Sequence, residues 1–483
     1  MLNLLDDSEA FQMAAWGVES RMLKEAYLSN YGGNLMKTDV LVIGGSAAGI
    51  VAATVGKSCY PDKEFLVLRD TKQTVVPCGI PYIFGSLDTS DKDVIPDGVF
   101  SKAGVNYKVA RATKIDAKNK ICRTEDGDEI AYDKLVLATG SRPRVPSWLP
   151  GTDLENVFTV SKDKEVLDRT LAKLQDCKKI VTIGGGFIGV EVSDEINKLG
   201  KDVTIVEVLP HVLGLAFDSE IAEQAGEMLV KRGIKIRTGV GVTKILGEGK
   251  ATGVELMNGE KIDADAVILA MGYTPNTSLA EDAGIPLNSK GCIRVDEYMR
   301  TETPDIFAIG DCAEKRDFVT RKPTGIMLAS TAASEARVAG TNLYQLSVVK
   351  TFSGTISIFA TAIGDTGFGV AGLTETSAKK EGFNIAVGTF TGVDKHPGTM
   401  PGTHSQYIKL IVGKSSGVLL GGEVVAGAST GELTNLIGLA IQARIPISTL
   451  FTAQIGTHPL LTAPPTAYPV IKAAESIMRG CSS

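Results

Sequence analysis

Hydrophobic positions along the chain mark two copies of one strand, turn and helix pattern. In the first copy, the apolar residues 40–43 lead into small and aliphatic residues as far as Thr54 through the turn Gly44-Gly45-Ser46-Ala47-Ala48-Gly49. In the second, residues 180–183 lead into a helical stretch that reaches Leu199 through the turn Gly184-Gly185-Gly186-Phe187-Ile188-Gly189. Short apolar runs predict buried strands, and the glycines predict tight turns before each helix. Both copies therefore indicate the α/β class.

The two copies also end alike. Residues 137–143 read Leu-Ala-Thr-Gly-Ser-Arg-Pro, and residues 269–275 read Leu-Ala-Met-Gly-Tyr-Thr-Pro. Units that share a beginning and an end indicate duplicated domains. We predict two Rossmann-like dinucleotide-binding domains, the first formed by residues 36–150 and 280–345 and the second by residues 151–279.

Other segments predict different structures. A buried strand at 306–309 ends on Gly310 and Asp311. From residue 350 to 483, short apolar runs alternate with turns, with a helix near 433–443, which predicts a separate α+β domain. Residues 1–35 show apolar positions at helical spacing and predict a helical extension, whose role the sequence does not reveal.

The second glycine turn carries every feature of a dinucleotide site. Such a turn lets the backbone approach a pyrophosphate, whose charge is held by N–H groups at the helix N-terminus, and an acidic residue about 20 positions later holds the adenosine ribose. The residues that fit this pattern are Gly184, Gly186, Gly189 and Glu207. Because Glu207 would repel a 2′-phosphate, we predict NADH in preference to NADPH.

The first glycine turn departs from this pattern at two positions. Ser46 replaces the second glycine, and the following strand, residues 65–68, ends on Arg69 where an acidic residue is expected. A turn of this kind can connect a strand and a helix without binding a ligand. The duplication favours a dinucleotide here as well, with the adenosine contacts as the least certain part of the motif.

Composition excludes several classes of function. A chain of 483 residues predicts more than one domain, and a net charge of -6 offers no basic surface for nucleic acid. The uncharged stretch 40–56 is short and interrupted by glycine, so no membrane span is expected. Asp6 and Asp7 stand where a secretory signal would be basic, which favours a cytoplasmic location.

Cys78 is the cysteine most suited to chemistry. The seven cysteines are dispersed, with no CxxC pair and no His/Cys spacing typical of a metal site, so we expect no metal and a reducing environment. Cys78 lies in a Pro-Cys-Gly-Ile-Pro-Tyr turn before a predicted helix, whose N-terminus would favour the thiolate. A lone cysteine can equally be a small buried hydrophobe, and we expect that role for Cys312.

These features together resemble the pyridine nucleotide-disulfide oxidoreductases: two Rossmann units, one cysteine after the first, and Gly310-Asp311. The chain is most similar to the single-cysteine branch, which includes coenzyme A-disulfide reductases, NAD(P)H sulfur or polysulfide reductases, and NADH oxidases and peroxidases. The resemblance implies FAD in the first unit, NADH in the second, and a dimerisation domain from about residue 350, hence a homodimer.

The resemblance also implies roles for individual residues. Asp311 would hold the flavin ribityl chain, and Glu191 would lie near the nicotinamide and the flavin. The two matching strand ends would line the cofactor sites through Ala138, Thr139, Gly140 and Gly272.

Departures from the family narrow the choice of branch. No second cysteine follows Cys78 at the CxxxxC spacing, and the first glycine turn lacks the histidine of the peroxidases. His458 lies in a segment similar to the one that supplies the acid-base histidine of two-cysteine enzymes, although Ala463 replaces the usual glutamate. A catalytic and a surface role for His458 both stay open.

The sequence therefore predicts an FAD-dependent NADH oxidoreductase that passes electrons through flavin to a disulfide, persulfide or polysulfide at Cys78. One alternative is an NADH oxidase that reduces oxygen. Another is an NADH-responsive flavoprotein that acts through a protein partner. The sequence does not specify the acceptor; coenzyme A would need basic side chains for its phosphates, and Lys72 is the nearest candidate.

Overall fold

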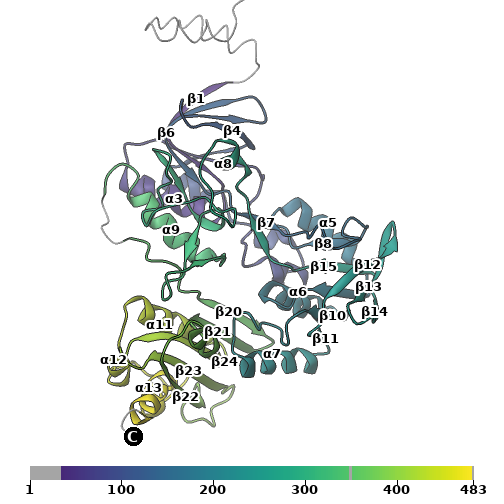
Figure 1. Ribbon diagram of the computed structural model, residues 1–483, viewed down its shortest axis with the longest axis vertical. Helices are drawn as coiled ribbons and strands as arrows, with labels where there is room; N and C mark the ends of the chain where they lie inside the picture. The colour runs from purple at the N-terminus through teal and green to yellow at the C-terminus, as the bar shows by residue number, and fades with distance from the viewer. Residues whose placement is uncertain (1–33, 347–350, 481–483) are drawn as a thin grey trace, which may run out of the picture.

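The computed structural model describes residues 34–346 and 351–480, which form two Rossmann units and a C-terminal domain (Figure 1). The helical extension predicted for residues 1–35 lies outside these ranges except for its last two residues, and Leu35 already belongs to the first strand. Within these ranges, no helix has both the length and the apolar character that crossing a bilayer requires.

The first unit is built on a largely parallel sheet. Its central strand is β1 (Leu35–Ile43), in which Val40, Leu41 and Val42 are fully buried. Consecutive buried residues are expected when helices or loops cover both faces of a parallel sheet. The other parallel strands, all in this sheet, are β2 (Phe65–Arg69), β3 (Asn106–Val109), β6 (Glu129–Leu137) and β17 (Ile306–Ala308).

Other elements complete this unit around the sheet. Helix α3 (Ala47–Cys59), which follows the first glycine turn, packs against α9 (Ala329–Thr341) from much later in the chain. Two antiparallel strands extend the sheet beyond β6, namely β5 (Ile121–Thr124) and β4 (Ala112–Asp116). The predicted strand at 306–309 is confirmed, and it pairs with β6.

The second unit repeats the arrangement. Its parallel sheet has the order β11 (Lys235–Thr238), β10 (Asp202–Glu207), β9 (Lys179–Ile183), β15 (Ala266–Leu269) and β8 (Val157–Thr159). Strand β9 leads through the second glycine turn into α6 (Phe187–Lys198). The order β3-β2-β1-β6 of the first sheet matches β11-β10-β9-β15 here, as expected of a duplication.

The two shared end motifs contact each other. Each forms a short strand, β7 (Ser141–Pro143) in the first copy and β16 (Tyr273–Pro275) in the second, and the two strands pair antiparallel. The ends of the duplicated units therefore connect the units to one another (Figure 1).

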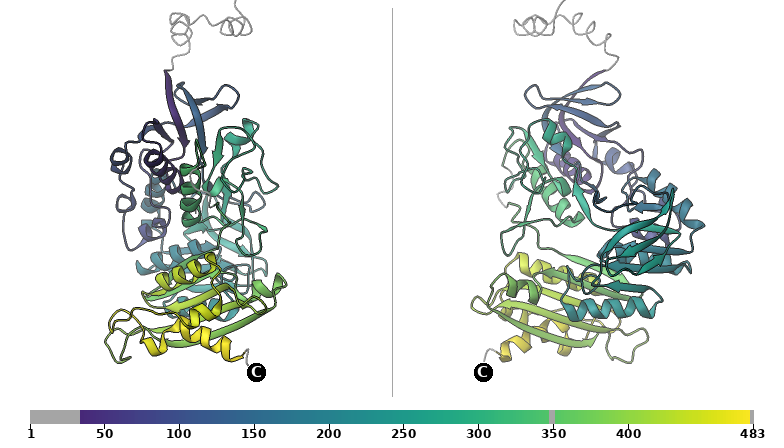
Figure 2. Two further views of the ribbon diagram at one scale, coloured as in Figure 1. Left: turned by 90° about the vertical axis from the view of Figure 1, so that its left-hand side faces the viewer. Right: turned by 45° about the vertical axis from the view of Figure 1, so that its right-hand side comes forward.

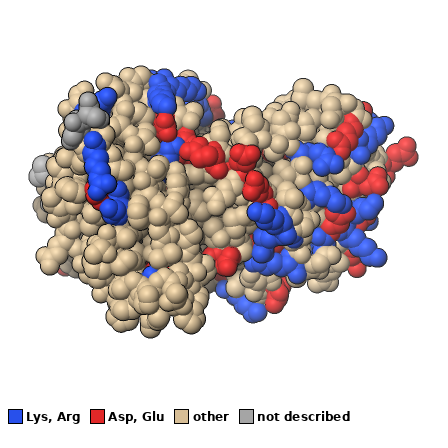
Figure 3. Space-filling model, turned by 90° about the horizontal axis from the view of Figure 1, so that it is seen from below, with Lys and Arg blue, Asp and Glu red and all other residues tan. Residues whose placement is uncertain are grey.

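The C-terminal domain is α+β, as predicted, and lies below both units in Figures 1 and 2. Helix α11 (Thr430–Gln442) packs on three strands of its antiparallel sheet, and α13 (Pro469–Gly480) packs on the other two. The sheet has the order β20 (Phe359–Ile363), β21 (Thr366–Gly372), β24 (Leu419–Ala426), β23 (Ser405–Gly413) and β22 (Ile385–Val393). Its underside shows wide areas without charged side chains, whereas the second unit beside it is densely charged (Figure 3).

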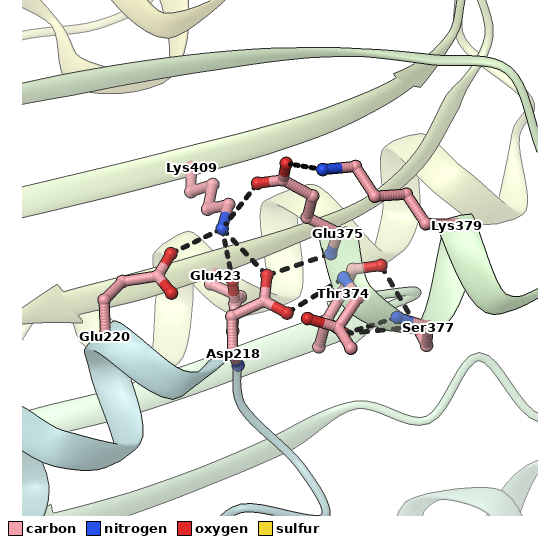
Figure 4. Close-up of polar contacts among 9 residues, drawn as sticks. Asp218, Glu220, Thr374, Glu375, Ser377, Lys379, Lys409 and Glu423 are labelled. Carbon is pink, nitrogen blue, oxygen red and sulfur yellow. Dashed lines mark hydrogen bonds and ion pairs between the residues drawn. The ribbon is translucent and has the colours of Figure 1, made fainter.

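A buried ion cluster joins the second unit to the C-terminal domain (Figure 4). The ammonium of Lys409 on β23 lies 2.8 Å from Asp218, 2.5 Å from Glu220 and 3.0 Å from Glu375. Asp218 also accepts the N–H groups of Glu375 and Thr376, at the start of α10 (Glu375–Lys380). Residues of two domains therefore share one cation.

Glu423 on β24 completes this cluster. Its Oε1 accepts the N–H of Asp218 at 2.7 Å, whereas its buried Oε2 has no hydrogen-bond partner among the described residues. Asp218, Glu220 and Glu423 lie close enough together to hold a metal ion, but the ammonium of Lys409 lies among them. Burial, together with the charge of Asp218, raises the pKa of Glu423 to about 8.

We expect Glu423→Gln to change the pH dependence of stability. The raised pKa means that this carboxyl group stabilises the fold most at low pH, and that its contribution falls as the pH rises from its ordinary pKa to about 8. For one proton, the free energy of unfolding changes by up to about 1.4 kcal/mol per pH unit. Glutamine does not titrate, so the variant should match wild type near pH 5 and become more stable than wild type near pH 8. Denaturant unfolding at both pH values measures this difference, and parallel stability curves would contradict it.

Candidate active site

Both glycine turns have the same geometry. Gly44 and Gly184 adopt positive φ angles of 120° and 109°. A Cβ on Gly44 would lie only 2.1 Å from the carbonyl oxygen of Ala138, and a Cβ on Gly184 only 2.4 Å from that of Ala270. Each of these alanines comes directly after the neighbouring strand. The third glycine of each turn is equally constrained, because a Cβ on Gly49 or Gly189 would lie within 1.9 Å of the carbonyl oxygen of the first. Only glycine fits at these positions.

The middle position of each turn tolerates a side chain. Ser46 and Gly186 both have extended backbones, with φ angles of -101° and -74°, so serine does not disturb the first turn. No side chain caps α3 or α6, and no described atom lies within 4 Å of a Cβ built on Gly186. The first N–H groups of both helices are therefore open to a ligand, which fits the pyrophosphate of a bound dinucleotide.

Glu207 ends β10 and turns back toward the second glycine turn. Its Oε2 accepts the N–H of Gly185 at 2.6 Å, and its Oε1 accepts the N–H of Leu209 at 2.8 Å. The carboxylate thus lies where a ribose hydroxyl would meet it and where a 2′-phosphate would be repelled. This position fits the predicted preference for NADH.

Arg69 ends β2 at the equivalent position of the first unit. Its guanidinium binds Asp97 through two nitrogens, at 2.6 Å and 2.9 Å, and lies over the ring of Tyr107. The aliphatic part of the side chain packs beneath Gly45, where a Cβ would lie 2.9 Å from Arg69 Cβ. Arg69 is therefore neutralised and buried, and it supports the first turn by packing. A direct contact with FAD remains a prediction.

Asp311 lies in a short 3₁₀ turn, η3 (Gly310–Cys312), that packs against the first glycine turn. Its Oδ2 accepts hydrogen bonds from Ser141 at 2.7 Å and from Lys162 at 2.9 Å. Although burial favours the neutral acid, the charge of Lys162 and these hydrogen bonds hold the pKa of Asp311 below its ordinary value. Sequence reasoning missed Lys162, which belongs to no glycine or cysteine motif.

A buried ion pair fixes the backbone of this turn. Glu335 on α9 accepts the N–H of Gly310 at 2.8 Å, and Lys315 donates to the carbonyl oxygen of Gly310 at 2.6 Å. The two side chains lie 3.0 Å apart and are almost fully buried. Because both contact Gly310, they determine where Asp311 lies. Neither residue showed a signal in the sequence.

Cys78 is exposed on a turn of the first unit. The element that follows is a 3₁₀ helix of five residues, η1 (Ile80–Phe84). Burial of the surrounding turn and the negative charge of Glu191 raise the pKa of the Cys78 thiol, with Lys162 opposing them. The prediction that a helix N-terminus favours the thiolate is therefore wrong, because burial and the charge of Glu191 act against the thiolate and the 3₁₀ helix is only five residues long. Cys312 is fully buried, as expected of a packing residue.

Glu191 lies in the second turn of α6 and faces the Cys78 turn from the second unit. Burial raises the pKa of Glu191 to about 7, against a hydrogen bond that Thr361 on β20 donates at 2.8 Å. Its charge acts on Cys78 and also on Tyr82. The cysteine turn, α6 and a strand of the C-terminal domain therefore meet at one place, while the position of Glu191 near the nicotinamide and the flavin stays a prediction.

The remaining predicted residues divide into two groups. Phe187 stacks on Phe359 of the C-terminal domain, with ring centroids 5.0 Å apart, and the next residue, Ile188, is half-buried. Thr139 donates to the carbonyl oxygen of Asn276 at 2.6 Å, beside the paired end motifs. The predicted residues at these motifs are Ala138, Thr139, Gly140 and Gly272, and the two glycines have open space around them.

His458 lies apart from this cluster. It is exposed in the segment before α13, and its Nδ1 accepts the N–H of Leu460 at 3.2 Å. Among the described residues, no hydrogen bond or ion pair connects His458 with Cys78 or Glu191. A catalytic role for His458 stays a prediction.

Comparison with known proteins identifies the family of the chain. A family model described as "Pyridine nucleotide-disulphide oxidoreductase" matches residues 38–336, and the model of that family's dimerisation domain matches residues 358–468. The chain is 32% identical over 459 residues to an NADH oxidase of Methanocaldococcus jannaschii, which covers 92% of this chain and 99% of the relative.

Two further relatives are named for sulfur chemistry. An NAD(P)H coenzyme A polysulfide/persulfide reductase of Pyrococcus horikoshii is 33% identical over 400 residues, covering 81% of this chain and 88% of the relative. The solved structure of an NAD-dependent persulfide reductase from A. fulgidus superposes with a TM-score of 0.84 at 30% identity, covering 92% of this chain and 84% of that one. The chain therefore belongs to the pyridine nucleotide-disulphide oxidoreductases, enzymes that use FAD and NAD(P)H.

Proposed function

We propose that this chain is an NADH-dependent reductase of small disulfides, persulfides or polysulfides, with Cys78 as the reacting group. The observation that carries the proposal is the position of Cys78, an exposed thiol on the first unit that Glu191 of the second unit faces. The names of the P. horikoshii and A. fulgidus relatives support the same class of acceptor.

The two units would hold the cofactors through their glycine turns. FAD would lie on the first turn with Asp311 near its ribityl chain, and NADH would lie on the second turn with Glu207 at its ribose. Bound FAD would supply a carrier of two electrons between the nicotinamide and sulfur. The protein's part is to fix these groups around Cys78 and to control the protons there.

The sulfur chemistry at Cys78 divides into two halves. In the first, the thiolate of Cys78 forms a bond to one sulfur of the acceptor, the S–S bond of the acceptor breaks, and the departing sulfur takes up a proton. In the second, two electrons that originate from NADH break the mixed disulfide, releasing the second thiol and restoring Cys78. With a single cysteine at this site, the mixed disulfide or persulfide takes the place of the internal disulfide of two-cysteine enzymes.

Oxygen reduction is the second candidate function. It is favoured by the M. jannaschii relative, which is named an NADH oxidase and matches the chain over nearly its whole length. In that case Cys78 would cycle through a sulfenic acid or would take no part.

An anaerobic titration distinguishes these functions. The purified protein is reduced with NADH, and coenzyme A disulfide, polysulfide and oxygen are then added in turn while the rate of flavin reoxidation is followed. We expect polysulfide or coenzyme A disulfide to reoxidise the protein faster than oxygen does. A faster reaction with oxygen would replace the proposal by the oxidase function, and no reaction with any acceptor would favour a flavoprotein that acts through a partner.

Coenzyme A is a candidate ligand rather than an assigned one. Lys72, the basic residue nearest to Cys78 in the sequence, is exposed and lies 3.8 Å from Glu165. An exposed lysine of this kind can contact a phosphate but does not form a site by itself. The P. horikoshii relative carries coenzyme A in its name, which is why coenzyme A disulfide belongs among the acceptors.

We also propose that the chain forms a homodimer through its C-terminal domain. This domain matches the family's dimerisation model, and its exposed apolar side chains include Leu436, Leu439, Leu460 and Leu461. Two of these leucines follow His458 closely in the sequence. A dimer would cover such side chains and could bring His458 to the Cys78 site of the other copy.

Glu207 should set the preference for NADH. In the double variant Glu207→Ala with Val208→Arg, a carboxylate that repels a 2′-phosphate is removed and a cation is supplied at an exposed position. We expect the ratio of kcat/KM for NADPH over NADH to rise by at least about tenfold, a change of about 1.4 kcal/mol. Glu223→Ala, an exposed carboxylate on α7 (Ser219–Lys231), is the control. An unchanged ratio would exclude Glu207 from the ribose site.

A further inference from the structure

Asp93 lies beneath the Cys78 turn and was not singled out by any motif. The segment that contains it pairs with the segment before the cysteine: Val76 donates its N–H to the carbonyl oxygen of Asp93 at 2.8 Å, and Ile95 donates to Thr74 at 2.8 Å. Two backbone hydrogen bonds therefore fix Asp93 next to the turn.

The carboxyl group of Asp93 occupies the space that a side chain at position 79 would need. A Cβ on Gly79 would lie 1.8 Å from Asp93 Oδ1 and 3.3 Å from Oδ2. The backbone of Gly79 has an ordinary φ of -85°, which any residue can adopt. Glycine is therefore needed at this position because of the carboxyl group, which lies against the residue that follows Cys78 in the chain and is close enough for its charge to act on the thiol.

This carboxyl group is buried and incompletely paired. Asp93 is 4% exposed, and its Oδ2 has no hydrogen-bond partner among the described residues. Burial alone raises the pKa of Asp93 to about 6. A buried acid without a cation partner costs stability, which is typical of residues kept for chemistry.

The charged groups near Asp93 and Cys78 are paired with other residues or act on the thiol. The charges that shift the pKa of the Cys78 thiol are those of Glu191 on α6, Asp311 on η3, Lys162 and Asp93. On the element that contains Asp93, η2 (Ser90–Asp93), the other acid is Asp91, which is exposed and paired with Lys164 at 2.7 Å. Lys92 on the same element is exposed and lies 3.9 Å from Asp88. Lys162 is already bound to Asp311 and Ser141.

We propose that Asp93 is the acid-base residue of sulfur exchange at Cys78, an inference that rests on the proposed function. Asp93 takes the proton of the Cys78 thiol, Sγ bonds to one sulfur of the acceptor, and the S–S bond breaks toward the departing sulfur. Asp93 then returns the proton to that departing thiolate. One S–S bond forms and one breaks, the proton is conserved, and no net oxidation occurs in this half of the reaction.

This role predicts that the effect of Asp93 on the exchange rate depends on how acidic the departing thiol is. A basic alkyl thiolate leaves slowly unless it is protonated, whereas an acidic aromatic thiolate leaves without a proton. General acid catalysis contributes a factor of about 100 or more where the proton is needed. The effect of removing Asp93 should therefore appear with alkyl disulfides and not with aromatic ones.

The test is a single exchange on the holoenzyme without NADH. Enzyme with reduced Cys78, carrying Cys59→Ser to remove the other exposed thiol among the described residues, is mixed with bis(2-hydroxyethyl) disulfide or with 5,5′-dithiobis(2-nitrobenzoate), and the Cys78 mixed disulfide is followed by mass spectrometry. We expect Asp93→Asn to slow the alkyl reaction by about 100-fold and the aromatic reaction by less than about threefold. Asp91→Asn, the exposed carboxylate nearby, should change neither.

The pH dependence of the exchange rate gives a second readout. In wild type, the rate of exchange with the alkyl disulfide should rise near pH 6, as Asp93 becomes able to accept a proton. The rate should fall again at higher pH, when the proton of the Cys78 thiol is lost to solvent and Asp93 has none to return. In Asp93→Asn the rise near pH 6 should be absent, and the rate should rise with ionisation of the thiol alone. Asp93→Ser serves the same comparison where asparagine packs poorly beside Gly79.

The possible outcomes separate this inference from the proposed function. If Asp93→Asn slows both disulfides equally, or neither, Asp93 acts only on the structure and the inference fails while the function stands. A wild-type enzyme that forms no mixed disulfide at Cys78 with either reagent would overturn the function and the inference together.

Discussion

Replacing Cys78 by serine is expected to lower NADH-dependent reduction of disulfides and polysulfides by at least about 100-fold, because the reacting nucleophile is lost. A serine hydroxyl cannot form the mixed disulfide or persulfide on which the proposed chemistry depends. The isosteric change leaves the glycine turns, Glu191 and the Lys409 cluster intact, so both cofactors should still bind. Anaerobic loss of NADH absorbance in the presence of each acceptor measures the effect.

Two controls make this result specific. Cys59→Ser removes the other exposed cysteine of the described chain and should leave the rates unchanged. Reduction of a small dye by NADH should continue in Cys78→Ser, since it needs no sulfur at the site. Full disulfide and polysulfide reduction by Cys78→Ser would show that Cys78 takes no part in the reaction. Undiminished oxygen consumption, with no sulfur activity even in wild type, would favour the oxidase.

Local motifs explain why the fold could be predicted from the sequence. The steric conditions at Gly44 and Gly184 involve only the turn and the neighbouring strand, so they recur in both copies and are visible as a repeated pattern. The extended backbone at Ser46 also explains why one departure from the glycine pattern leaves the turn intact. The α+β prediction for the C-terminal domain depended on the same short-range alternation of apolar runs and turns.

The site was predictable only where its residues belong to motifs. Cys78, Glu191 and Asp311 were found from their neighbours in the sequence, whereas Lys162 and Asp93 act through contacts that no local pattern records. The prediction of a thiolate at Cys78 was wrong for the same reason, because the burial and the Glu191 charge that raise the pKa of its thiol depend on parts of the chain far away in sequence. A long-range charge balance cannot be read from a turn and the start of a helix.

Replacing Lys409 by methionine should have the largest effect on stability. Its ammonium neutralises carboxylates from the second unit and the C-terminal domain, and its side chain is 4% exposed. Burial works against the charged amine, but the hydrogen bonds to Asp218, Glu220 and Glu375 raise the pKa of Lys409. Without the cation, buried acids of two domains would face each other unpaired, and we expect a loss of about 3–5 kcal/mol in the free energy of unfolding.

The ion cluster also allows a test of coupling between the two domains. Lys414→Met, on an exposed lysine just beyond β23, should change the free energy of unfolding by less than about 0.5 kcal/mol. The double variant Lys409→Met with Asp218→Asn should cost at least about 1 kcal/mol less than the sum of the two single changes, because the removed charges are partners. Urea unfolding of wild type, the three single variants and the double variant measures both effects. Strict additivity would mean that Lys409 and Asp218 do not stabilise each other.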